Sequence, residues 1–172
     1  MYMHIHAMGD AVTIAKAIHD ALALTKTPFV ASAATPAAEI GIDTKQIDQI
    51  MGQSGKVNGG VYQYSIARAD EITDTAMTKM VIPPSMGLAQ AINFQPTGAG
   101  MAAITGDFVL LAGEVTPVMK ALRENGIEVT AVHSHMLTEN PRLFFMHFWA
   151  NDDALKLARG LRAALDKVKL TH

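Results

Sequence analysis

The sequence predicts an α+β fold, with an antiparallel or mixed sheet of about five to six strands and helices packed on one face. Three observations support this prediction. Strand patterns outnumber helix patterns, and most strands follow one another through short turns that are typical of hairpins. Two amphipathic segments with a helical period each carry one apolar stripe, which should be buried against a sheet.

The composition is that of a compact folded protein. Of the 172 residues, 49% are hydrophobic and 17% are charged, so the chain can bury a core of its own. A net charge of -2 gives no electrostatic reason to expect a nucleic acid partner. The sequence has no cysteine, so any metal must be held by histidine and carboxylate side chains. Without a run of about 18 apolar residues, we expect no membrane span.

The start of the chain resembles its end. Aligned without gaps, residues 1–26 and 144–169 are identical at nine positions, and one of these pairs His4 with His147. Each segment is predicted to be a strand followed by an amphipathic helix. Alanine-rich helices inflate such similarity, but the histidine match falls in the strands, outside that bias. The pattern therefore indicates an internal repeat.

This repeat divides the chain into three parts. We expect residues 1–26 to be the terminal strand and helix of an incomplete first repeat, residues 27–42 to be a linker, and residues 43–169 to form one complete unit. The strand Tyr2–His6 would then lack its own unit and expose unpaired backbone groups. It should add to a sheet edge, in the same chain or by exchange between chains, which predicts a homo-oligomer.

The first half of the complete unit begins with a short helix, expected over Thr44–Met51 and capped by Asp43 or by its own first residue. A glycine-rich loop at residues 55–60 then leads into the strand Val61–Ala67. A phosphate-binding loop must lead into a helix instead, so we expect no nucleotide cofactor. Residues 70–86 show little periodicity and are predicted to be a long surface loop, suited to act as a lid.

The second half of the unit begins with a hairpin. Its strands are expected over Leu88–Gln95 and Ala102–Leu111, joined by a turn rich in Pro and Gly. Thr116–Pro117 suits the start of a helix over Val118–Asn125, which Gly126 should end. Two more strands, described next, and the final amphipathic helix complete the unit.

Three of the seven histidines gather in the segment 132–149. His133 and His135 are two residues apart, so in a strand their side chains point to the same face. Two apolar runs flank Glu139-Asn140-Pro141, and Asn-Pro favours a turn. The chain should reverse there and bring His147 back beside the first two histidines.

The register of this hairpin decides whether the three histidines meet. If Met136 pairs with Phe144, His147 lies directly opposite His133, whereas a slip of one residue would remove it from the site. Three histidines, with Glu139 or a water as fourth ligand, match zinc or another divalent first-row ion. The sequence therefore predicts a small-ligand or divalent-metal site on this hairpin.

Other functions of the same region stay open. One histidine could act as a general base oriented by Glu139. No single histidine is distinguished for this role, so no catalytic residue is assigned. An aromatic face around Trp149, with Tyr62 or Tyr64, could instead hold a glycan or a peptide without catalysis. A third alternative is an assembly domain. The candidate ligand-binding residues are Trp149, Phe145, Tyr62, Asn93 and Arg142, and Gln95 and Asp107 could add further polar groups to a cleft.

Several separate motifs resemble those of one bacterial family. They are Gly55–Tyr62, Ile92–Gly98, Ala103–Leu110, Leu122–Ala131 and Phe144–Trp149. Over residues 42–168 they resemble the LppY/LpqO family, also known as domain of unknown function 1259. The resemblance implies a protein with two such units, exported or lipid-anchored in the cell envelope, and implies no particular activity. Charged residues interrupt the apolar stretch that a signal peptide needs, so we expect no export signal in residues 1–34.

Overall fold

The computed structural model describes residues 5, 7–26, 40–76 and 79–171. The chain forms two compact units, Met1–Ala34 and Thr35–His172. Each unit is described by itself below.

The first unit contains helix α1 (Ala11–Ala23). Its N-cap is Asp10, whose carboxylate accepts a hydrogen bond from the Thr13 amide at 2.9 Å, as the sequence predicted for this acidic residue. No residue of α1 is buried, so its predicted apolar stripe is not covered by the residues of this unit that the structure describes. The predicted strand Tyr2–His6 lies, apart from Ile5, outside the described residues.

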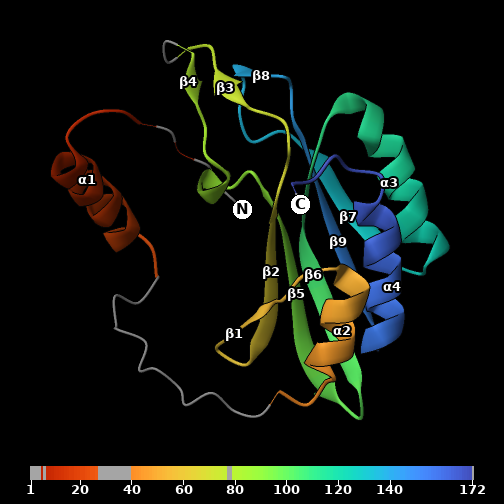
Figure 1. Ribbon diagram of the computed structural model, residues 1–172. Coiled ribbons are helices and arrows are strands. Elements are labelled where there is room, and N and C mark those ends of the chain that lie inside the picture. The colour runs from red at the N-terminus through yellow and green to blue at the C-terminus, as the bar shows by residue number, and fades with distance from the viewer. Residues whose placement is uncertain (1–4, 6, 27–39, 77–78, 172) are drawn as a thin grey trace. The chain divides into compact units, whose positions relative to one another are not determined.

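The second unit is built on a six-stranded sheet, and every neighbouring pair in it is antiparallel. In spatial order its strands are β1 (Lys56–Asn58), β2 (Val61–Ala67), β5 (Ala89–Gly98), β6 (Met101–Leu110), β9 (Phe144–Asp153) and β7 (Glu128–His133). The three helices that follow cover one of its faces (Figure 1). The predicted α+β fold is therefore confirmed.

Helices α2 (Thr44–Met51), α3 (Ala112–Glu124) and α4 (Ala154–Leu165) form this layer, and α4 packs against both of the others (Figure 1). Alternate residues of each inner strand point towards the helices. The fully buried side chains of this core include Ile92, Phe94, Ile104, Phe108, Phe148, Ile47 and Leu122. The stripe predicted for the last helix is buried here, at Leu157, Leu161, Ala164 and Leu165.

The helix bounds agree with the sequence at α2 and differ at α3. Asp43 caps α2 by accepting a hydrogen bond from the Gln46 amide at 3.0 Å. Helix α3 begins at Ala112, well before the predicted start, and carries Pro117 inside it. The reason is Glu114, whose carboxylate accepts the Leu111 amide proton at 2.7 Å and so satisfies a free donor at the helix start.

Residues 70–86, predicted to be a surface loop, contribute to a second sheet instead. In this sheet β3 (Thr73–Asp74) lies between β4 (Met80–Val81) and β8 (Glu139–Asn140), and the short 3-10 helix η1 (Pro84–Met86) follows β4. A second apolar cluster lies beneath it: Ile72, Ile82, Leu88, Val109, Leu143 and Phe145. A strand of two residues is too short to show alternation of apolar and polar residues, so the sequence does not predict these strands.

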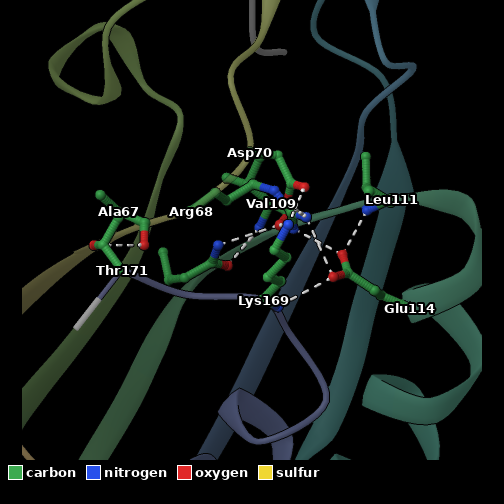
Figure 2. Close-up of polar contacts among 9 residues, drawn as sticks. Ala67, Arg68, Asp70, Val109, Leu111, Glu114, Lys169 and Thr171 are labelled. Atoms are coloured by element: carbon green, nitrogen blue, oxygen red, sulfur yellow. Dashed lines mark hydrogen bonds and ion pairs between the residues drawn. The ribbon is translucent and has the colours of Figure 1, made fainter.

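A buried ionic network ties the end of β2 to β6 and α3 (Figure 2). The Arg68 guanidinium donates to the Val109 carbonyl at 2.7 Å, to Asp70 at 2.7 Å, and to both Glu114 oxygens at 2.7 and 3.2 Å. Glu114 also accepts the Lys169 amide proton, which fixes the chain after α4. Burial alone would raise the pKa of Asp70, but the hydrogen bond and charge of Arg68 hold this pKa below its ordinary value.

Candidate metal centre

The three predicted histidines meet on the face of the main sheet that the helices leave open. His133 is the last residue of β7, His135 follows it in the connection to β8, and His147 lies within β9. One ring nitrogen from each lies within 4.8 Å of the others. All three side chains are partly exposed, so an ion in solution can reach them.

The sequence left the register of this hairpin open, and the observed register differs from the one that would set His147 directly opposite His133. Phe145, not His147, lies opposite His133, and Ala131 lies opposite His147. This is a slip of two positions, and a slip of two keeps every side chain on its own face. His147 is therefore the diagonal neighbour of His133, still within cross-strand reach.

His135 reaches the cluster for a different reason than the sequence indicated. Strand β7 ends at His133, so strand alternation does not place the side chain of His135. Its ring instead stacks on Phe145, with ring centroids 3.6 Å apart and planes inclined by 8°. Phe145 is fully buried. Phe145, a candidate ligand-binding residue, therefore supports the imidazole of His135 by stacking beneath it.

The hydrogen positions on His147 follow from its neighbours. Its Nδ1 lies 3.3 Å from the Gly106 carbonyl oxygen and 3.7 Å from Oδ1 of Asp107. The Gly106 carbonyl can only accept, and the Asp107 charge lies nearby, so both favour a proton on Nδ1, which leaves the lone pair on Nε2. That Nε2 lies 2.6 Å from Nε2 of His133. Metal-binding histidines are usually oriented by such an acceptor on their other nitrogen.

Asp107 of β6 is the carboxylate beside this cluster. It pairs in register with His147, and its Oδ2 lies 4.0 Å from Nε2 of His135. Its side chain is only 17% exposed. In the sequence Asp107 is one of several polar strand residues, and only the pairing of β6 with β9 places it beside the histidines.

Glu139, the predicted fourth ligand, is not a member of this group. It lies in β8 of the small sheet and is 6% exposed. Its carboxylate accepts hydrogen bonds from the Leu143 amide at 3.1 Å and from the Arg142 guanidinium at 3.4 Å. Both Glu139 and Arg142 thus stabilise the chain reversal before β9.

The other candidate ligand-binding residues divide between the two faces. Trp149 and Asn93 lie on the open face, and Trp149 is 47% exposed. Tyr62 lies on the helix-covered face, where its hydroxyl donates to Oδ1 of Asp48 at 2.7 Å. Tyr64 donates to the same oxygen at 2.6 Å. Burial, together with the hydrogen bond and negative charge of Asp48, raises the pKa of Tyr64 well above its ordinary value.

Comparison with known proteins gives a family and no activity. Neither a curated protein nor a solved structure matches this chain. Among the residues that the structure describes, no helix has the length and apolar character needed to cross a membrane. The match to a known family extends over residues 45–167, a range that contains both sheets, the three histidines and Asp107. The chain belongs to the family described as Domain of Unknown Function (DUF1259).

Proposed function

We propose that this domain binds a divalent first-row metal ion through His133, His135 and His147. The observation that carries the proposal is the convergence of their three ring nitrogens within 4.8 Å. Three histidines with one position left open form the ligand set of catalytic zinc sites. Imidazole is also a good ligand for iron, nickel and copper, so ligand type alone favours zinc without excluding these ions.

The spacing of the rings fits an ion after a small adjustment. Two nitrogens bound tetrahedrally to one zinc ion at about 2.0–2.1 Å are about 3.3 Å apart. The Nε2 atoms of His133 and His147 would therefore separate from 2.6 Å to that distance, and the more distant ring nitrogens of the cluster, which lie within 4.8 Å, would approach one another. Because His133 is the last residue of an edge strand, rotation of its side chain can supply this movement without disturbing the sheet.

Asp107 supports the ligands in this proposal. With one oxygen near each of His135 and His147, its negative charge would stabilise imidazole rings that donate electron density to a cation. The open position would take a water molecule or a group of a small ligand. Glu139 is left out of the proposed ligand set because its carboxylate binds Leu143 and Arg142.

Metal analysis of the purified, tag-free protein tests the proposal. The wild-type chain should retain about one zinc ion per chain after dialysis, as one three-histidine site predicts. The double variant His133→Ala, His135→Ala should retain almost none, while the control His19→Ala, which removes an exposed histidine of α1, should behave as wild type. Circular dichroism would verify that each protein is folded. Equal and sub-stoichiometric metal in wild type and double variant would refute metal binding at this site.

The assembly alternative stays a separate proposal. We infer that Tyr2–His6 would pair with a sheet edge, in the same chain or in a second copy, because it repeats the sequence of the start of β9. Analytical ultracentrifugation of the full chain tests the exchanged form. A monomer at all protein concentrations would contradict exchange between chains.

A further inference from the structure

A hollow of about 390 Å³ opens on the same sheet face as the histidines. It is lined by Val61, Gln63, Asn93, Gln95, Ala103, Thr105 and Trp149. Thr105 and Trp149 are paired across β6 and β9, and so are Asp107 and His147 two residues further along. Residues two apart on a strand share a face and are about 7 Å apart. The hollow therefore lies directly beside the proposed metal centre.

The polar groups of the hollow are uncharged and held in place. The Asn58 amide donates to Oε1 of Gln63 at 2.9 Å, and Gln63 donates in turn to Oδ1 of Asn93 at 2.7 Å. Asn93 then donates to the Thr105 carbonyl at 3.2 Å. Each amide has a second N–H and further acceptor capacity, which no other residue that the structure describes uses. Fixed donors and acceptors of this kind lower the entropic cost of binding a ligand.

Trp149 gives the hollow an aromatic wall. Its side chain is 47% exposed, although the indole is the largest apolar group in the chain. An exposed indole combines a flat apolar surface with one N–H donor, and such residues are enriched in binding sites. A ligand that fits would present an apolar face to the ring and hydrogen-bonding groups, such as hydroxyls, to the amides.

We propose that this hollow is a subsite for a neutral carbohydrate. The C–H face of a sugar ring would pack against Trp149, and its hydroxyl groups would bind Gln63 and Asn93. The absence of a charged side chain among the lining residues argues against an acidic or phosphorylated ligand. Sugar binding at Trp149 does not depend on the proposed metal centre. Contact between the sugar and an ion bound by the histidines, in contrast, rests on the proposed function.

A peptide fits this place less well. One common way to recognise an extended peptide is to add it as a strand to the free edge of a sheet. The strands beneath the hollow, β2, β5, β6 and β9, are all paired on both sides. Their backbone groups are therefore used within the sheet, and recognition depends on side chains.

Fluorescence titration tests the inference directly, because Trp149 is the only tryptophan of the chain. We would titrate cellotetraose, chitotetraose, maltotetraose and mannotetraose, and expect at least one to change the emission of Trp149 saturably. The variant Asn93→Ala keeps the fluorophore and should weaken that binding about tenfold, as expected for a lost pair of hydrogen bonds. In calorimetry, Trp149→Ala should also weaken binding about tenfold. Met86→Ala removes another exposed apolar side chain, in η1, and should change nothing.

The same variants separate this inference from metal binding. Asn93→Ala and Trp149→Ala should bind zinc as wild type does, which also demonstrates that they are folded. The double variant His133→Ala, His135→Ala should lose zinc and still respond to the sugar. Zinc binding with no response to any of the four sugars would overturn the carbohydrate subsite and leave the metal centre intact. Sugar binding that is unchanged in both hollow variants, or an emission change with uncharged tetrapeptides alone, would overturn it as well.

Discussion

Gly106 controls both the packing of β6 and the orientation of a proposed metal ligand. Its carbonyl oxygen lies 3.3 Å from Nδ1 of His147. A Cβ atom at this position would lie 1.9 Å from the Ala91 carbonyl oxygen and 2.8 Å from Cζ of Phe148. The backbone oxygen cannot move away without disrupting the pairing of β5 with β6, so only glycine fits here.

The variant Gly106→Ala should lower the free energy of unfolding by about 3 kcal/mol, because the added methyl group overpacks the contact between two strands. Gly113→Ala is a matched control. That position lies in α3, where the added carbon would have no neighbour within 4 Å apart from its chain neighbours and the helix backbone, and alanine should stabilise the helix by about 0.5–1 kcal/mol. Urea unfolding measures both changes. Equal stability of Gly106→Ala and wild type would show that β5 and β6 are further apart than described.

Asp107 should matter for metal affinity and not for the fold. Asp107→Asn preserves the shape of the side chain and removes its charge, so zinc affinity should fall by about tenfold to a hundredfold. Competition with a chromophoric chelator measures this affinity. Asp166→Asn, at a carboxylate 59% exposed beside Arg162, is the control and should bind zinc as wild type does. The same affinity in both variants would exclude a supporting role for Asp107.

Individual site residues were predictable to different degrees. His133 and His147 could be placed together from side-chain alternation alone, because the observed slip of two positions does not change the face. The position of His135 depends on stacking against Phe145, and that of Asp107 on the strand next to β9. Contacts between distant strands leave no local pattern in the sequence.

Asp48 gives helix α2 a polar attachment to strand β2, beside the buried Ile47 and Met51 of the same helix. Its Oδ1 accepts hydrogen bonds from Tyr64 at 2.6 Å, from Tyr62 at 2.7 Å and from the Gly55 amide at 3.1 Å. Burial alone would raise the pKa of Asp48, but these hydrogen bonds hold it below its ordinary value. The ionised carboxylate therefore stabilises the folded state.

This arrangement predicts that the variant Asp48→Asn loses folding stability to an extent that depends on pH. Because the folded-state pKa lies below the unfolded value of about 3.9, the contribution of Asp48 is complete well above that pH. It disappears as the pH falls through the lowered pKa. At pH 7 the variant should be about 1–3 kcal/mol less stable, and the difference from wild type should shrink below about pH 4. Urea unfolding at a series of pH values checks this, and a pH-independent difference would contradict it.

The elements with strong local signals were close to their predicted bounds. Helix α2 begins after its predicted cap Asp43, and β2 has the predicted bounds. Strand β5 is longer than expected, since the turn to β6 is only Ala99-Gly100, and β6 has the expected length with bounds shifted by one residue. The small sheet was missed because β3 pairs with β8, from a distant part of the chain.

The second unit contains every residue that the proposed metal centre and sugar subsite need. Both hydrophobic clusters, the histidines and the hollow lie within Thr35–His172. A protein comprising residues 35–172 should therefore unfold cooperatively, with a Tm within about 3 °C of the full chain. Its zinc affinity should be unchanged. Thermal unfolding by circular dichroism measures the first property, and a protein without a cooperative transition would show that residues 1–34 are needed for folding.

Anomalous diffraction at the zinc absorption edge, from crystals grown with zinc, would locate the ion directly. We expect one strong peak about 2.0–2.1 Å from a ring nitrogen of each of His133, His135 and His147. The ring nitrogens of His133 and His147 should have moved apart to admit it. A zinc peak elsewhere, with these three imidazoles still in contact with one another, would contradict the assignment of this cluster as a metal centre.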